Sequence, residues 1–201
     1  MNIKNVIYNM SDDIFNQTEI IKYFKLVLLI SIIFVILSFI IMGPTKDLIR
    51  AVILIEFMTV VAVINYYHGI IPDKLNLLFG IVGIIINLLT GKVAILSMIL
   101  GLLIGGGVLF ISALAYELIS KREGIGGGVI KYVAVLGLWL GYKYILITMV
   151  IGFMGLIITH VIMSLIKIKK ESFSPADIYF SFGAFVSITY SERLLNMIGW
   201  L

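Results

Sequence analysis

The chain has 201 residues, of which 61% are hydrophobic and 13% are charged, and its mean hydropathy is +1.15. Soluble domains carry about 25% charged residues, so this composition excludes a soluble globular protein and predicts a surface that faces lipid. The absence of cysteine excludes disulfides, thiolate catalysis and zinc sites with cysteine ligands. The net charge of +4 comes without a basic stripe interleaved with aromatic residues, which argues against nucleic acid as a partner.

Successive apolar runs predict an all-α, polytopic membrane protein with about six to seven transmembrane helices. A bilayer core about 30 Å thick needs roughly 20 apolar residues per helix. The run 26–42 follows a mixed polar segment and precedes no small-residue cleavage site, so we interpret it as a retained span rather than a signal peptide. We expect the short run 130–141 to cross only part of the membrane or to continue past Lys143. The runs are 26–42, 51–67, 75–90, 93–118, 130–141, 144–166 and 178–190.

The chain is expected to consist of an N-terminal segment, 1–25, and a single transmembrane domain, 26–201. Apolar residues at mixed spacing in the N-terminal segment fit an amphipathic helix that lies on the membrane surface. They fit a disordered tail equally well, and the sequence leaves both interpretations open.

Lysine and arginine are distributed unequally between the two sides of the predicted topology. If the N-terminus shares a side with the loops after the second, fourth and sixth runs, that side holds ten of these residues and the other side five. The positive-inside rule then predicts a cytoplasmic N-terminus. The loop 68–74 and the glycine-rich stretch 121–131 both face the cytoplasm in this topology.

These two cytoplasmic segments carry unusual residue patterns. The first reads VAVINYYHGIIPDKLNLLFGIVG over 61–83, and the second reads KREGIGGGVIK over 121–131. Glycine in membrane helices usually serves close packing, but the charges beside 124–128 place these glycines in a loop. There they allow positive φ and let an extended substrate backbone approach closely. A phosphate-binding loop is a poor alternative because the GK[ST] ending and a preceding strand are both absent.

Together the two segments resemble the type IV prepilin leader peptidase family, membrane-embedded aspartic proteases of the GxGD type. In that family an aspartate stands seven residues before the proline of an Ile-Pro-Asp or Ile-Pro-Asn stretch, which here contains Pro72 and Asp73. A second aspartate follows a glycine cluster of the form G-M-G-G-G-D. The resemblance covers about 45–190. At the glycine cluster the matching residues are Gly124, Gly126, Gly127 and Gly128, followed after position 129 by Lys131.

The chain departs from this family at both aspartate positions, where it has Asn65 and Val129. The resemblance implies two facing carboxylates that share a proton, one acting as general base on water and the other polarising the scissile carbonyl. Neither asparagine nor valine can take a proton from water, so the chain is predicted not to hydrolyse peptides by this mechanism. Deliberate inactivation and natural loss of catalysis both explain the substitutions, and the intact surrounding motif favours inactivation.

No other acid in the sequence makes a convincing second catalytic pair. Glu56 lies some 13 Å along its helix from Asn65. The remaining candidates belong to loops or flank basic residues, and they are Asp73, Glu117 and Glu123.

By resemblance, the parent activity is endoproteolysis of prepilins and pseudopilins between a short basic leader and a hydrophobic helix. It would take place at the cytoplasmic face of a bacterial inner membrane, with the substrate helix between the enzyme's own helices. Asn65 and Val129 would mark the catalytic positions. The predicted substrate-binding residues are Gly124, Gly126, Gly127, Gly128, Lys131, Pro72 and Asp73.

No cofactor is implied, and the two histidines, His68 and His160, have no spacing that predicts a metal site. Many relatives also methylate the new N-terminus, but we do not expect that activity because the segment 43–50 is short and contains no cysteine. The competing interpretations are a non-catalytic pilin-binding pseudoprotease and a small transporter. A transporter would show corresponding broken helices in two halves, and the sequence shows no such symmetry.

Overall fold

The computed structural model describes residues 17–121, 125–166 and 176–190, in which every element is a helix. The predicted all-α class is therefore confirmed, and each predicted apolar run lies largely within one helix. The helices of the described ranges are α2 (Gln17–Met42), α3 (Lys46–His68), α4 (Asp73–Thr90), α5 (Ile95–Ser120), α6 (Gly127–Leu140), α7 (Tyr142–Leu165) and α8 (Ala176–Thr189).

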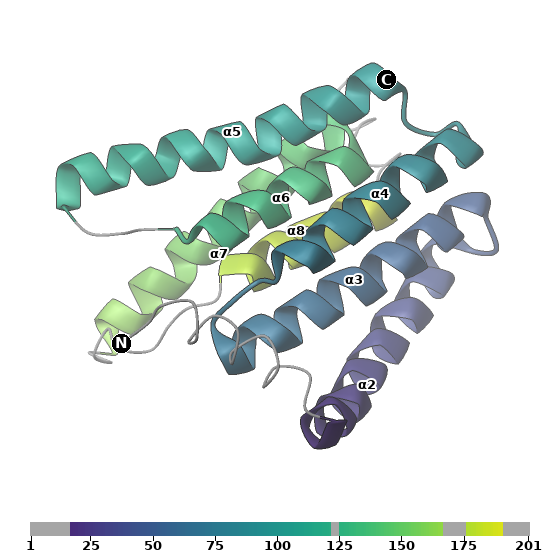
Figure 1. Ribbon diagram of the computed structural model, residues 1–201, viewed down its shortest axis with the longest axis horizontal. Helices are drawn as coiled ribbons and strands as arrows, with labels where there is room; N and C mark the ends of the chain where they lie inside the picture. Colours follow the sequence, from purple (N-terminus) through teal and green to yellow (C-terminus); the bar gives the residue numbers. More distant parts are fainter. Residues whose placement is uncertain (1–16, 122–124, 167–175, 191–201) are drawn as a thin grey trace.

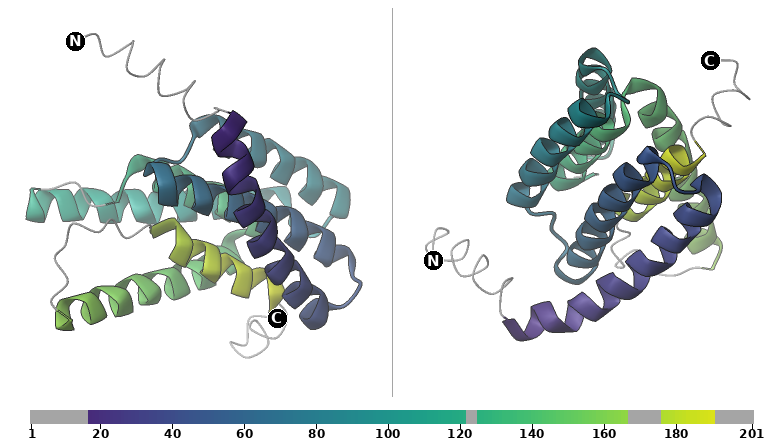
Figure 2. Two further views of the ribbon diagram at one scale, coloured as in Figure 1. Left: turned by 90° about the horizontal axis from the view of Figure 1, so that it is seen from below. Right: turned by 90° about the vertical axis from the view of Figure 1, so that its right-hand side faces the viewer.

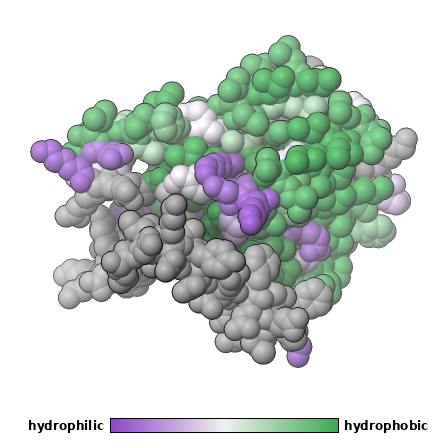
Figure 3. Space-filling model, in the orientation of Figure 1, coloured by the Kyte–Doolittle hydropathy of each residue, from purple (hydrophilic) through white to green (hydrophobic). Residues whose placement is uncertain are grey.

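The described residues contain four helices that are long and apolar enough to cross a membrane: α4, α5, α7 and the part of α2 from Lys25. The apolar helices α6 and α8 are shorter. Apolar side chains cover most of the described surface visible in Figure 3, as the composition predicts for a protein in lipid. The surface arrangement expected for residues 1–25 stays a prediction, because residues 1–16 lie outside the described part and α2 begins at Gln17.

Helix α3 is long enough to span a membrane but is not among the four candidates. It carries charged residues, and two of them are bound inside the protein. Ser31 Oγ donates to Glu56 Oε2 at 2.9 Å, and Arg50 donates to the carbonyl oxygen of Trp139 at 3.1 Å. Charged side chains in membrane segments are tolerated where they face protein, so packing against neighbouring helices accounts for the composition of α3.

A sharp reversal at Gly141 separates α6 from α7. Gly141 has φ 79° and ψ 172°, a conformation that favours glycine. The predicted alternative that the run 130–141 continues past Lys143 is therefore wrong. With 14 residues, α6 is about 21 Å long and is shorter than a bilayer core.

Helix α6 lies at the centre of the packing. It touches α5 backbone to backbone at Gly101 and Gly137, where a Cβ on either glycine would clash with the carbonyl of the other. On the α4 side, the Trp139 indole lies over Gly83 and donates from Nε1 to the carbonyl of Phe79 at 2.9 Å. Tyr132 and Trp139 are both fully buried.

The bundle has two ends that differ in which helix termini they gather. The C-terminal ends of α3, α5 and α7 lie at the same end as the N-terminal ends of α4, α6 and α8 (Figure 1). We call this the site end and the opposite one the far end. Helix α2 crosses the bundle on the side of α3 and α8 (Figure 2), and Phe34 packs edge-on against Phe185 with ring centroids 4.8 Å apart.

Candidate functional site

The two motif segments meet at the site end. Ile71 lies against Gly128, where an added Cβ would stand 3.3 Å from Ile71 Cβ and 3.6 Å from its backbone nitrogen. Lys131 Nζ lies 2.7 Å from Asp73 Oδ2. Segments that are far apart in the sequence are thus in contact through residues of both motifs.

The first motif segment forms the tight connection between α3 and α4. Gly69 adopts a left-handed conformation with φ 67° and ends α3, and its N–H donates to the carbonyl of Asn65 at 2.8 Å. Pro72 is extended at φ −66° and precedes the first residue of α4, Asp73. This geometry puts Asn65 in the last turn of α3 and Asp73 at the start of α4.

The second motif segment begins a helix earlier than the sequence predicts. Gly127 and Gly128 lie in the first turn of α6, and Gly126 precedes it with φ −63°. The expectation of a loop is therefore wrong for Gly127 and Gly128 and agrees with Gly126, and none of the three has a positive φ. Gly124 lies outside the described residues. Gly126 and Gly127 are exposed with open space around an added Cβ. A helix start leaves several N–H groups without helical partners, and glycine leaves these groups uncovered.

Asn65 and Val129 are both buried at the site end. Asn65 is 2% exposed and Val129 is 7% exposed. The side-chain amide of Asn65 donates from Nδ2 to Oδ1 of Asp177 at 2.5 Å. That positions 65 and 129 face each other stays a prediction, whereas the contact between Asn65 and α8 is directly visible in the structure.

Asp177 belongs to a polar network that joins three helices. It lies in the first turn of α8 and is fully buried. Ser181 Oγ donates to the carbonyl of Asp177 at 2.6 Å and lies 2.6 Å from the hydroxyl of Tyr132 on α6. We call Asn65, Asp177, Ser181 and Tyr132 the polar network. Tyr132 follows Val129 by about one helical turn, so the network connects the surroundings of Asn65 and Val129.

Sequence reasoning missed Asp177 because it was assigned to the polar stretch 167–177 between the last two apolar runs. The available signal was its place directly before the apolar run 178–190, since an acid at the edge of a membrane helix is a functional candidate. Its Oδ2 has no hydrogen-bond partner within the described structure, and the same holds for both side-chain polar atoms of the buried Asn76 on α4.

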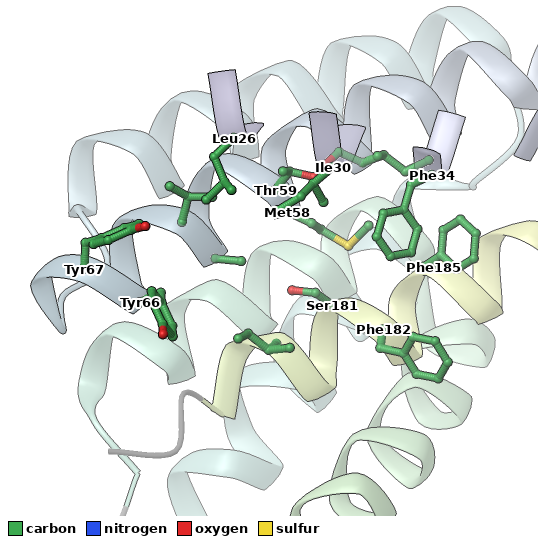
Figure 4. A pocket seen from close by; sticks show the side chains of 14 residues that line it. Leu26, Ile30, Phe34, Met58, Thr59, Tyr66, Tyr67, Ser181, Phe182 and Phe185 are labelled. Atoms are coloured by element: carbon green, nitrogen blue, oxygen red, sulfur yellow. Dashed lines mark hydrogen bonds between the residues drawn. The ribbon is translucent and has the colours of Figure 1, made fainter. Parts of the chain in front are cut away.

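An apolar cavity of about 380 Å³ lies beside the network, between α2, α3 and α8. Figure 4 shows the Ser181 hydroxyl pointing from α8 into this space. The cavity is therefore apolar on most of its wall and reaches the polar network at one point. Its lining residues are Leu26, Ile30, Phe34, Ile55, Met58, Thr59, Ala62, Val63, Tyr66, Tyr67, Ile178, Ser181, Phe182 and Phe185.

No group of three or more His, Cys, Asp or Glu side chains among the described residues is arranged to hold a metal ion. Glu56 on α3 accepts a hydrogen bond from Ser31 on α2 instead of joining the polar network. The polar network thus supplies one buried carboxylate, one buried amide and two hydroxyls.

Comparison with known proteins identifies the family of this chain. The model of the type IV leader peptidase family matches residues 52–168. The chain is 25% identical over 148 residues to a prepilin leader peptidase/N-methyltransferase of Neisseria gonorrhoeae, which covers 74% of this chain and 51% of that protein. It is 28% identical over 136 residues to a protein of the same description from Pectobacterium carotovorum subsp. carotovorum, covering 66% and 49%.

The chain spans about half the length of these curated relatives. No solved structure matches it. The family match includes both motif segments, which the fold brings into contact at the site end, and it extends over more than half of the chain. This multi-pass membrane protein belongs to the type IV leader peptidase family.

Proposed function

We propose that the chain binds the N-terminal part of a prepilin or pseudopilin at the cytoplasmic face of a bacterial inner membrane. The bound part would be the basic leader and the hydrophobic helix that follows it. The proposal rests on the contact between the two motif segments, in which Ile71 lies against Gly128 and Asp73 pairs with Lys131. Family membership supplies the class of substrate.

Several features of the site end suit such a substrate. Gly126 and Gly127 are exposed, and the free N–H groups of a helix start can donate to carbonyls of an extended peptide. The Asp73 side chain is 67% exposed and offers negative charge to a basic leader. The apolar cavity of about 380 Å³ can take hydrophobic side chains from the start of the substrate helix.

The cytoplasmic location is supported by charge. The loop after α3 and the start of α6 touch each other and so share one side of the membrane. The predicted topology gives that side ten lysine and arginine residues against five on the other. An excess of basic residues marks the cytoplasmic side.

Hydrolysis by two facing aspartates is not part of the proposal. Asn65 and Val129 occupy the positions that correspond to the family's aspartates, and neither side chain can act as a general base. The proposed function is limited to binding of the substrate.

The test compares two glycines of equal steric freedom. An added Cβ at Gly127 or at Gly107 meets no atom within 4 Å, so alanine at either position should be tolerated and should stabilise the helix by about 0.4–1 kcal/mol. Binding of a fluorescent prepilin N-terminal peptide is measured for the full chain in detergent. We expect Gly127→Ala to weaken binding about tenfold, which is about 1.4 kcal/mol, and Gly107→Ala to leave it unchanged. The proposal fails if the unaltered protein binds the peptide no better than a scrambled leader sequence.

A further inference from the structure

We propose that Asn65 and Asp177 form a hydrolytic pair with a single carboxylate. In this pair Asp177 activates a water molecule, and Asn65 binds the carbonyl oxygen of the amide that is cleaved. The inference rests on the proposed function, which supplies the peptide substrate. It departs from a mechanism with two aspartates because position 129 takes no part in it.

The pair is a specific contact between two distant parts of the chain. Asn65 and Asp177 are 112 positions apart, and their side chains meet at 2.5 Å between Nδ2 and Oδ1. Asn65 is held in the last turn of α3, and Asp177 is held in the first turn of α8. A hydrogen bond to a carboxylate is short and directional, so it fixes both side chains relative to each other.

The free carboxylate oxygen is the feature that a structural role leaves unexplained. Asp177 is fully buried, and its Oδ2 has no partner among the described residues. A buried polar atom without a partner costs about 1–3 kcal/mol, and more if it is charged. The position of Asp177 in the first turn of α8 is favourable for negative charge, but this does not give Oδ2 a hydrogen bond. Acids at such cost within membrane proteins commonly serve function.

The pair is also placed beside a route for a peptide. Ser181, which donates to the carbonyl of Asp177, lines the apolar cavity and points into it (Figure 4). Tyr66 and Ile178 line the same cavity, and they directly follow Asn65 and Asp177 in the sequence. The cavity is therefore lined by Ser181 and by the residues that follow the pair in the sequence, and its apolar wall suits hydrophobic residues of the substrate.

The chemistry needs no second carboxylate. Ionised Asp177 takes a proton from water as the water oxygen attacks the scissile carbonyl carbon. The carbonyl oxygen becomes an oxyanion that accepts a hydrogen bond from the Asn65 amide. The tetrahedral intermediate then collapses, the C–N bond breaks, and the proton held by Asp177 moves to the leaving nitrogen. The products are a carboxylic acid and an amine, and Asp177 returns to its ionised form.

Each residue supplies a known kind of rate enhancement. A positioned general base contributes about 10²–10⁴-fold. A neutral side-chain amide that binds an oxyanion contributes about 10²–10³-fold. Asparagine at position 65 is then a working part of this mechanism, whereas it is a disabling substitution in a mechanism that needs an aspartate there.

The experiment uses the full chain in detergent with a full-length prepilin. Mass spectrometry detects release of the leader, and peptide binding is measured on the same samples. We expect the unaltered protein to cleave, and Asp177→Asn to lower the cleavage rate at least about 100-fold without changing binding. The matched control is Glu56→Gln, since Glu56 is an acid within a different helix, α3, and its bond from Ser31 can be kept by glutamine. This control should cleave like the unaltered protein.

The outcomes separate this inference from the proposed function. Binding without cleavage by the unaltered protein overturns the inference and leaves the proposed function intact. Absence of both binding and cleavage overturns both. If Asp177→Asn does not fold, Asn65→Ala decides, with an expected loss of about 100-fold in rate at unchanged binding. Either folded variant that cleaves at the unaltered rate overturns the inference.

Discussion

Buried polar side chains lie at both ends of the bundle, but they contact different groups. At the far end, Asn87 Nδ2 donates to the carbonyls of Leu138 at 3.1 Å and Trp139 at 3.2 Å, and Arg50 donates to the same Trp139 carbonyl. These carbonyls belong to the last turn of α6 and have no helical partners of their own. The far-end side chains therefore complete the hydrogen bonding of a helix terminus inside the protein.

At the site end, the buried side chains of Asn65 and Asp177 contact each other. Both ends contain unpartnered polar atoms among the described residues, including Arg50 Nε at the far end and Asp177 Oδ2 at the site end. The ends thus differ in the role of their hydrogen bonds. Termination of α6 explains the far end. At the site end, the start of α8 favours the negative charge of Asp177, but Oδ2 is left without a partner among the described residues.

The largest expected effect is a loss of stability when the interactions of Arg50 at the far end are removed. Arg50 is 9% exposed and binds both Asp47 and the Trp139 carbonyl, so Arg50→Ala removes one partner from each of them. Removing one member of a buried ion pair costs about 3–5 kcal/mol, and we expect the lower value because Asp47 keeps Lys92 at 2.7 Å. Thermal unfolding in detergent measures the loss. Lys92→Ala, which breaks the more exposed pair, should cost less than about 1 kcal/mol, and equal losses for both variants would contradict this account of the far end.

The next largest effect is on the rate of prepilin cleavage, and it tests whether the site end is catalytic. Asn65→Asp puts a second carboxyl group next to Asp177, and two carboxyl groups at such a distance share one proton. A protonated carboxyl polarises a carbonyl more strongly than an amide, so we expect prepilin cleavage about 100-fold faster than in the unaltered protein. Leader release measured by mass spectrometry checks this.

The control for that variant is the same exchange at the far end. Asn87→Asp puts a carboxylate against carbonyl oxygens and should lower stability without any gain in cleavage. If Asn65→Asp cleaves no faster alone and gains activity only together with Val129→Asp, positions 65 and 129 form the catalytic pair and Asp177 does not.

A smaller loss of stability is expected from Asn87→Leu. The substitution keeps the volume of a core residue but removes the donor to the Leu138 and Trp139 carbonyls, which then lie buried with fewer partners. We expect a loss of about 1–2 kcal/mol, measured by thermal unfolding, with prepilin binding unchanged. A loss of binding at unchanged stability would show that the far end also takes part in function.

Local patterns in the sequence were sufficient to predict the positions of the helices, because an apolar run of membrane length indicates a helix that lies in lipid. The resemblance to the leader peptidase family predicted that the segments around Pro72 and Gly128 belong to one site, and the structure puts these segments in contact. The pairing of Asn65 with Asp177 could not be predicted in this way. It depends on how α8 packs against α3, and nothing in the 14 residues of α8 encodes that neighbour.

The glycine cluster shows a second limit. Charges beside Gly126 and Gly127 predict that these residues lie at the membrane edge, and both are exposed. The sequence could not tell a loop from a helix start, because glycine is tolerated in both when the first N–H groups need no helical partner. Contacts with Ile71 and Asp73 hold this helix start in place.

The smallest expected effect on stability comes from the exposed ion pair at the site end. Asp73 and Lys131 are 67% and 57% exposed, so Asp73→Asn should change stability by less than about 1 kcal/mol. If Asp73 attracts a basic leader, the same variant weakens prepilin binding at 0.1 M salt, where the Debye length is about 10 Å, and has little effect at 1 M salt, where it is about 3 Å. Peptide binding at both salt concentrations checks this.

Asp47→Asn is the far-end counterpart. It breaks pairs with Arg50 and Lys92, so it should lower stability more than Asp73→Asn and leave binding unchanged at either salt concentration. Equal changes in binding for both variants would mean that the leader responds to the overall charge of the protein, and that the acid at the site end has no special part in recognition.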